Sequence, residues 1–197
     1  PHDISVILSL CNNKLPKVVT CKGQCHITDG IHDITNSILE FNDNKYVNIN
    51  VNWLNPYKEQ KMSIIGDKGM ILFDDTAKEN KLTYFPEYIN FTSDLNKLPT
   101  PVKNNEEYVQ VDMSISPLLK ECQHFIHCCK TREEPITSGE EGVRVLKVLK
   151  ALHESLIDNK SIEMDKPTAN VFVHKTAIVD DGAEIGEGSK IWHYSHI

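Results

Sequence analysis

Apolar residues near the start of the chain recur with the period of an amphipathic helix. Four of them share one helix face: Ile4, Ile7, Leu8 and Cys11. Asp3 begins this segment, where a carboxylate can accept backbone N–H groups, and Asn12-Asn13 followed by Pro16 end it. The pattern predicts a helix over residues 3–11.

Between residues 17 and 85 the apolar period changes to two, which is the period of strands. The alternating segments are 17–27, 31–41, 45–54, 61–66, 69–74 and 81–85. Tight-turn sequences separate several of them, at Asp29-Gly30, Asn42-Asp43-Asn44 and Asp67-Lys68-Gly69. We therefore expect a meander of antiparallel strands. One of them has a polar row opposite an apolar row, so one face of the sheet packs and the other meets water or a partner; the polar row is Tyr46, Asn48, Asn50 and Asn52.

The remaining pattern predicts one long loop and two helices. Residues 86–112 contain three prolines and no period, which predicts a loop. Ser116-Pro117 indicates the start of a helix that runs to about residue 130. The capping box Ser138-Gly-Glu-Glu141 indicates a second helix that runs to about residue 157. The expected class is α+β, an open, mostly antiparallel sheet of about six strands with helices on one face.

A six-residue repeat marks the end of the chain. Its aliphatic positions are Val173, Val179, Ile185, Ile191 and Ile197, and small residues follow the first four by four positions. This repeat predicts a parallel β-coil in which each unit forms one side and the aliphatic residue points inward. We therefore expect a domain over residues 1–157, a linker over 158–170 and the start of a β-coil over 171–197.

Composition and charge narrow the classes of function. The chain has 197 residues, 21 Lys and Arg, 28 Asp and Glu, and a formal net charge of −7. Phosphates repel an acidic chain, so nucleic acid and anionic membranes are not expected partners. No apolar run approaches the roughly 20 residues that span a bilayer. Six cysteines without a CxxC pair favour reduced thiols in a cytoplasmic protein. Since the chain starts at Pro1 and ends inside a repeat, we expect a segment of a longer protein.

Two groups of Cys and His residues resemble zinc ligands only superficially. Cys21 and Cys25 share a face of a predicted strand but lie about 13 Å apart along it, too far to share one ion. On the predicted helix around residue 124, only His124 and Cys128 lie within one turn, which supplies two ligands. The sequence therefore predicts no metal site.

Several separated motifs resemble one protein family. They are Pro1-His2-Asp3-Ile4-Ser5, Trp53-Leu54-Asn55-Pro56-Tyr57-Lys58-Glu59, Ile64-Ile65-Gly66-Asp67-Lys68-Gly69-Met70, Phe73-Asp74-Asp75, Glu121, His124-Phe125-Ile126 and Pro135-Ile136-Thr137-Ser138. In this order they resemble the C-terminal domain of the Gfo/Idh/MocA oxidoreductases, over roughly residues 1–157. More narrowly, they are similar to the branch that oxidises UDP-N-acetylglucosamine or its uronate at C3.

The resemblance implies roles for His2 and Lys58. In the family, a His that follows an Asp by four positions lies beside the nicotinamide and assists proton transfer at the sugar hydroxyl. His2 matches that His, while the Asp would lie ahead of the first residue. His2 can also be read as a terminal residue without a role, and Asp3 as a helix cap or a second catalytic carboxylate. Lys58 either binds a phosphate or carboxylate of the substrate or is a solvated lysine.

The resemblance also implies NAD as the cofactor of the parent protein, but not of this chain. The family's nucleotide-binding half, with its catalytic Lys, normally precedes the residues present here. No G-x-G-x-x-G occurs in the sequence, so this chain is not expected to bind NAD by itself.

The repeat at the end resembles a second type of enzyme. Ile185-Gly186-Glu187-Gly188 and Ile191-Trp192-His193-Tyr194-Ser195-His196-Ile197 look like the opening of a left-handed β-helix N-acetyltransferase that acts on nucleotide amino sugars. The parent is then a fusion of dehydrogenase and acetyltransferase.

Three interpretations remain open from the sequence. In the first, the chain is the substrate-binding and oligomerisation half of an NAD-dependent nucleotide-sugar 3-dehydrogenase, and it pairs through the open sheet face. In the second, it is a non-catalytic assembly module attached to a hexapeptide acyltransferase. In the third, acetyl transfer is the main activity of the parent.

Overall fold

A computed structural model describes most of the chain as two compact units. The described residues are 1–90, 98–112, 114–164, 172–180, 182–183, 185–186 and 189–197. One unit comprises Pro1–Trp53 with Thr137–Ile197, and the other comprises Leu54–Ile136. Within the described residues, no helix is both long enough and apolar enough to cross a membrane.

The first unit contains two helices and an antiparallel sheet. The helices are α1 (His2–Leu10) and α3 (Gly139–Asp158). The sheet has the order β10-β1-β2-β3, with β1 (Val18–Gln24), β2 (Ile34–Glu40), β3 (Tyr46–Asn52) and β10 (Ile162–Glu163). Each pairing between neighbouring strands of this sheet is antiparallel, as predicted for the meander.

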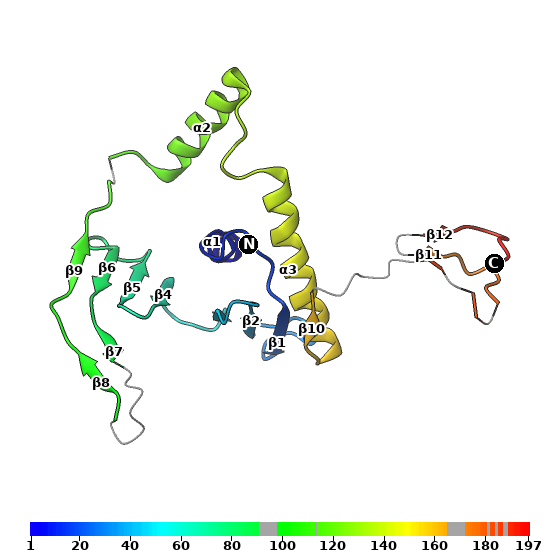
Figure 1. Cartoon of the computed structure of the whole chain (residues 1–197), viewed down its shortest axis with the longest axis horizontal. Coiled ribbons are helices and arrows are strands. Elements are labelled where there is room, and N and C mark those ends of the chain that lie inside the picture. The colour runs from blue at the N-terminus through cyan, green and yellow to red at the C-terminus, as the bar shows by residue number, and fades with distance from the viewer. Residues whose placement is uncertain (91–97, 113, 165–171, 181, 184, 187–188) are drawn as a thin grey trace. The chain divides into compact units, whose positions relative to one another are not determined.

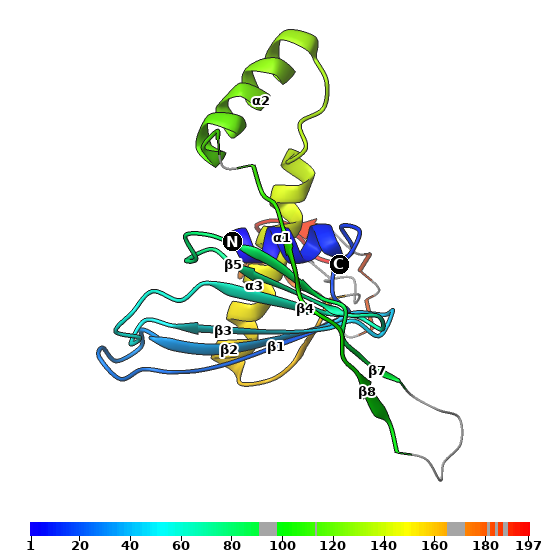
Figure 2. The same ribbon diagram turned by 90° about the vertical axis from the view of Figure 1, so that its left-hand side faces the viewer.

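The core of the first unit lies where α1, α3 and the sheet meet. Helix α3 packs on β1 and on α1, and it crosses one face of the sheet (Figures 1 and 2). Four aliphatic side chains are completely buried there: Leu8, Val19, Leu39 and Val148. Val145 and Leu152 of α3 are also buried.

A tight turn connects β1 to β2, as the sequence predicts. Gly30 has φ +79°, a left-handed conformation that glycine adopts without steric cost. A bridge pairs Thr28 with Ile31 across the turn, and the Ile31 N–H donates to the Thr28 carbonyl at 3.1 Å. The β1–β2 hairpin therefore closes at Asp29-Gly30.

The second unit contains one larger sheet, one smaller sheet and one helix. The larger sheet has the order β4-β5-β6-β9, with β4 (Lys61–Ile65), β5 (Met70–Asp74), β6 (Leu82–Phe85) and β9 (Glu107–Val109). β7 (Tyr88–Asn90) pairs with β8 (Thr100–Val102). Helix α2 spans Pro117–Thr131, and the Ser116 hydroxyl caps it by accepting from the Leu119 N–H at 3.3 Å.

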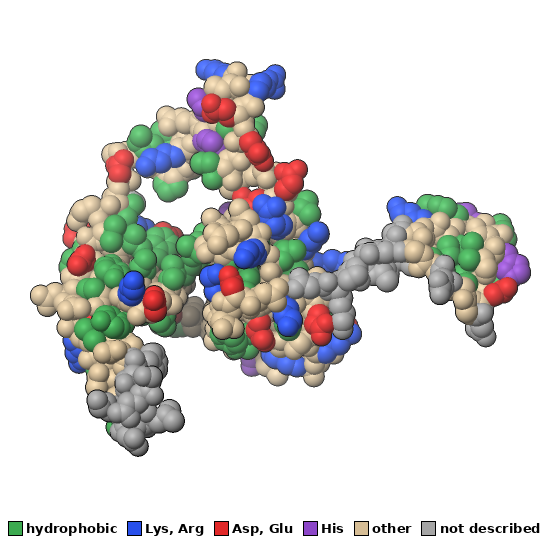
Figure 3. Space-filling model, in the orientation of Figure 1, with side chains coloured by type: hydrophobic (Ala, Val, Ile, Leu, Met, Phe, Trp, Pro, Cys, Tyr) green, Lys and Arg blue, Asp and Glu red, His purple; other side chains and the backbone are tan. Residues whose placement is uncertain are grey.

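Hydrophobic side chains also lie at the surface of the second unit (Figure 3). Exposed members on its strands include Ile65, Ile71, Phe73, Tyr108 and Val109. Taken by itself, the second unit therefore exposes apolar side chains of its strands to solvent.

Two expectations about the sheet are wrong. Residues 86–112 are not a long loop, because β7, β8 and β9 form within them. The strands do not form one open sheet of about six, because the described chain has two separate four-stranded sheets and two two-stranded ones. The ladder of β3 ends at Asn52, and residues 53–60 that follow include Pro56, which has no N–H for a sheet bond.

Parallel pairing occurs in the C-terminal segment. β11 (Phe172–Val173) pairs in parallel with β12 (Lys190–Ile191), and an isolated parallel bridge joins Ile178 to His196. Both pairings join residues 18 apart, which is three repeats of six. Ile191 is buried, whereas Val173 and Ile197 are exposed.

Candidate functional site

The exposed first turn of α1 carries the residue that the sequence singled out. His2 is the first residue of α1 and its side chain is exposed. Pro1 occupies the cap position without a side-chain bond, and its carbonyl accepts from the Ser5 N–H at 3.0 Å. Asp3 is therefore not the cap that the pattern predicted. Because the helix begins one residue earlier, Asp3 lies within its first turn, at the positive end of the helix dipole.

Residues after His2 hold α1 in the first unit. Ile4, Ile7 and Leu8 are buried, as predicted from their spacing. At the edge of this apolar face, the Ser5 hydroxyl donates a hydrogen bond of 2.5 Å to Glu141 Oε1 in the first turn of α3. Glu141 is only 7% exposed. The hydrogen bond between Ser5 and Glu141 thus connects the first turns of α1 and α3 beside apolar contacts.

The capping-box pattern at residue 138 predicts a different partner for Glu141. In a capping box this carboxylate would return to the Ser138 backbone. The structure keeps half of the box, since the Ser138 hydroxyl accepts from the Glu141 N–H at 3.4 Å. The carboxylate itself bonds to Ser5 instead. Sequence reasoning missed this contact because the two residues are 136 positions apart.

Lys58 lies in the loop between β3 and β4, with an exposed side chain. It belongs to the second unit, whereas His2 belongs to the first. Two aromatic residues of the same segment are also exposed, Trp53 at 82% and Tyr57 at 64%. Packing inside the chain therefore does not account for either aromatic side chain.

The possible zinc ligands make other contacts. Cys21 is buried, and its sulfur accepts from the Ser37 hydroxyl at 3.3 Å. On α2, His124 Nε2 lies 3.6 Å from the Cys128 sulfur and accepts from the Ile136 N–H at 3.1 Å. In the part of the chain that the structure describes, no three His, Cys, Asp or Glu side chains gather as a metal site would require.

A His–Asp pair on the β1–β2 hairpin was not predicted. Asp33 Oδ1 accepts from His26 Nδ1 at 2.7 Å, and Oδ2 accepts from the N–H groups of His26 and Ile27 at 2.6 and 2.9 Å. The His26 side chain and these backbone donors hold the pKa of the Asp33 carboxyl at about 2, below its usual 3.8. Asp33 is 7% exposed and His26 is about half exposed. This arrangement closes the hairpin loop.

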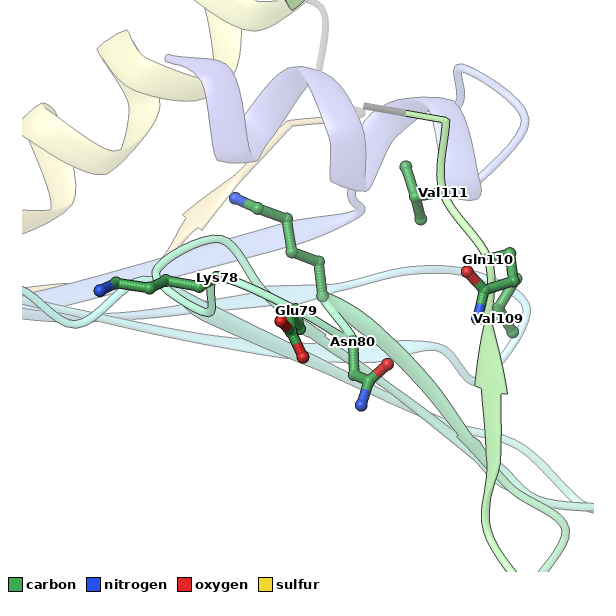
Figure 4. Close-up of a pocket in the computed structure, with 7 residues that line it drawn as sticks. Lys78, Glu79, Asn80, Val109, Gln110 and Val111 are labelled. Atoms are coloured by element: carbon green, nitrogen blue, oxygen red, sulfur yellow. The ribbon is translucent and has the colours of Figure 1, made fainter. Parts of the chain in front are cut away.

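A hollow of about 380 Å³ lies within the second unit. Figure 4 shows Lys78, Glu79 and Asn80 on one side of it and residues 109–111 on the other. Lys81, which also lines it, is paired with Asp75 Oδ1 at 3.0 Å. Neither His2 nor Lys58 lines this hollow.

The described elements of this chain do not include the arrangement that usually holds the diphosphate of NAD. That group needs a glycine-rich turn between a parallel strand and a helix N-terminus. The sequence has no such glycine motif. Among the described elements, the strands that pair in parallel are β11 and β12, and no helix follows either of them.

Solved structures share the fold of the chain. A probable dehydrogenase from Thermotoga maritima is 19% identical, with 84% of this chain and 48% of that one covered and a TM-score of 0.60. UDP-N-acetylglucosamine 3-dehydrogenase GnnA from Acidithiobacillus ferrooxidans is 18% identical, with 79% and 46% covered and a TM-score of 0.64. The WlbA dehydrogenase from Bordetella pertussis, in complex with NADH and UDP-GlcNAcA, is 19% identical, with 83% and 42% covered and a TM-score of 0.57.

These structures share the fold of the chain but are longer than it. The chain spans slightly less than half of each of these three structures. No curated protein matches it. The model of the oxidoreductase family's C-terminal alpha/beta domain matches residues 1–164. The chain therefore belongs to the Gfo/Idh/MocA oxidoreductase family, as its C-terminal alpha/beta domain.

Proposed function

We propose that the chain is the substrate-binding and oligomerisation half of an NAD-dependent nucleotide-sugar 3-dehydrogenase whose substrate is a UDP-N-acetyl sugar. The family match over residues 1–164 carries the proposal. It is supported by two structures of the same fold, one a UDP-N-acetylglucosamine 3-dehydrogenase and the other a dehydrogenase in complex with NADH and UDP-GlcNAcA. In this proposal residues 1–157 are the domain, and 158–170, which include β10, connect it to the C-terminal segment. The protein is cytoplasmic in this proposal.

His2 takes the proton of the sugar hydroxyl in this proposal. Oxidation of an alcohol requires a base for the hydroxyl proton, and a neutral imidazole suits that task near neutral pH. The exposed position of His2 on the first turn of α1 leaves its ring accessible to a ligand. The sequence has no glycine-rich diphosphate turn, and in this proposal a nucleotide-binding half outside these residues holds the cofactor.

Lys58 binds a phosphate or carboxylate of the substrate as a point charge. Its exposed loop position supports this role, because a lysine that is not buried keeps its ammonium group available. Lys58→Ala should raise KM for the nucleotide sugar more than it lowers kcat. Lys68→Ala, at another exposed turn of the same unit, is the control. An unchanged KM in Lys58→Ala refutes this role.

The decisive experiment substitutes His2 in the protein that includes the nucleotide-binding half. His2→Asn should lower kcat by roughly 10²–10⁴-fold, with a smaller effect on KM, because a proton acceptor is lost. His153→Asn changes an exposed histidine on α3 and should leave kcat unchanged. Wild-type turnover in His2→Asn removes this residue from the mechanism, and failure to oxidise any UDP-N-acetyl sugar favours the assembly-module alternative.

A homo-oligomer through the sheet face is part of the proposal. The polar row of β3 contains Tyr46, Asn48 and Asn50, which are exposed, and Asn50 Nδ2 donates to Asn36 Oδ1 of β2 at 2.9 Å. An interface of this type should bury on the order of 1,200 Å² or more in total. Light scattering at tens of micromolar should give an even-numbered oligomer, and Tyr46→Glu should dissociate it. A monomer at that concentration contradicts the proposal.

The C-terminal segment is the start of a left-handed hexapeptide β-helix in this proposal. The parallel pairing at an offset of 18 residues and the burial of Ile191 support it, since one coil of such a helix has three six-residue sides. The protein would then join the dehydrogenase to a nucleotide-amino-sugar N-acetyltransferase. Incubation of the whole protein with acetyl-CoA and a UDP-amino sugar should yield the N-acetylated product, and its absence contradicts the fusion.

A further inference from the structure

A buried carboxylate connects α3 to the helix that carries His2. Glu141 is 7% exposed and accepts a 2.5 Å hydrogen bond from the Ser5 hydroxyl. Carboxylates are rarely buried unless they are paired, because removing the charge from water is unfavourable. In the described structure, the Ser5 hydroxyl supplies a hydrogen bond to Oε1 of this carboxylate.

The Glu141 carboxylate bonds to Ser5 rather than to the first turn of its own helix, α3. Ser138 already accepts the Glu141 N–H. The neighbouring Glu140 accepts hydrogen bonds from its own backbone and from Ser138, and these hold the pKa of the Glu140 carboxyl below its usual value. The Glu140 and Glu141 N–H groups thus have acceptors other than the Glu141 carboxylate, which bonds to Ser5 of α1 instead.

The contact lies one turn from His2. Residues three apart on a helix share a face, so Ser5 and His2 lie near each other along α1. The apolar residues Ile4, Ile7 and Leu8 hold α1 on the core, but dispersion contacts are not directional. A short hydrogen bond to a carboxylate is directional, so the bond between Ser5 and Glu141 restricts sliding and rotation of α1 on α3.

We propose that Glu141 is a positioning residue, which holds α1 through the Ser5 hydroxyl and thereby sets the place of His2 for proton transfer. This inference rests on the proposed function. This role differs from a role in stability alone, because it predicts that kcat is lowered even in variants that remain folded. A small displacement of a catalytic group can lower the rate by up to about 10²-fold.

The test measures turnover in the protein that includes the nucleotide-binding half. Ser5→Ala and Glu141→Ala should each lower kcat by about 10-fold or more, with KM nearly unchanged. The double variant should be no slower than the slower single variant, because the two groups act through one contact. Glu141→Gln keeps a carbonyl that can accept from Ser5 and should restore most of the activity. Glu154→Ala, an exposed glutamate on α3, is the control.

Hydrogen exchange in the chain itself gives a second readout. The amides of α1 should exchange faster in Ser5→Ala and Glu141→Ala than in the unmodified chain, while those of β2 keep their protection. Unchanged kcat in folded Ser5→Ala overturns the inference and leaves the proposed function intact. Unchanged exchange in α1 also overturns it. Full turnover in His2→Asn overturns the proposed function and this inference with it.

Discussion

The backbone N–H of Cys21 in β1 donates a hydrogen bond of 2.8 Å to the hydroxyl of Ser155 in α3. β10 pairs only with Val18 and Val19 of β1, so it does not reach Cys21. Ser155 therefore takes the place of a strand partner there. Its hydroxyl donates in turn to the Lys160 carbonyl at 2.5 Å, so it also holds the chain that leaves α3.

Removing this hydroxyl should destabilise the first unit. Ser155 is fully buried, and Ser155→Ala leaves the Cys21 N–H and the Lys160 carbonyl without it. We expect a loss of about 1–3 kcal/mol in the free energy of unfolding. Ser161→Ala removes an exposed hydroxyl that bonds to Thr20 and should cost less than about 1 kcal/mol. Urea denaturation measures both, and equal midpoints would contradict the role of Ser155.

Two glycines should respond to alanine with opposite signs. A Cβ on Gly23 would lie 2.7 Å from the Ile34 carbonyl oxygen and 3.1 Å from Leu156 Cδ1, so Gly23→Ala must displace backbone and should cost about 1–3 kcal/mol. Gly142 lies in α3 with nothing within 4 Å of a Cβ, so Gly142→Ala should stabilise by up to about 1 kcal/mol. Thermal unfolding of both variants tests this prediction. A shift of the two midpoints in the same direction would contradict it.

Substitution by alanine should destabilise the chain by different amounts at two leucines of α1. Leu8 is 0% exposed and Leu10 is 51% exposed. Leu8→Ala should cost about 2–5 kcal/mol because it leaves a cavity in the core. Leu10→Ala should stay within about 1 kcal/mol of the unmodified chain, since surface substitutions rarely do more. Denaturation of the two variants under identical conditions provides the check, and a tolerated Leu8→Ala would mean that α1 is not docked.

The Asp33 carboxylate should make stability depend on pH in the acid range. Its pKa is about 2 in the folded chain, below the ordinary 3.8, so the folded state binds the proton more weakly than the unfolded state. Its contribution to the free energy of unfolding is complete above the ordinary pKa and is lost as the pH falls toward about 2. Asp33→Asn should remove this contribution, so wild type and variant converge on acidification. Asp29→Asn, on the same hairpin, is the control, and a constant difference across the range would refute the assignment.

Local sequence determined the elements with a long, regular pattern. The predicted helix over residues 3–11 is α1 (His2–Leu10), and the helix predicted up to about residue 157 is α3 (Gly139–Asp158). The six alternating segments contain β1 to β6. Apolar residues at i and i+3 lie on one face of a helix, and those at i and i+2 lie on one face of a strand. The buried face can therefore be predicted from a few neighbouring positions of the chain.

The tertiary structure alone decided the contacts made at long range. β7, β8 and β9 are three residues each, too short for a period to mark them, and they form because partner strands supply their hydrogen bonds. The bond from Ser5 to Glu141 joins residues 136 apart, and that from Cys21 to Ser155 joins residues 134 apart. A capping motif can place the Glu141 backbone, but the partner of its carboxylate depends on which helix packs beside it, and only the folded chain brings that helix within reach.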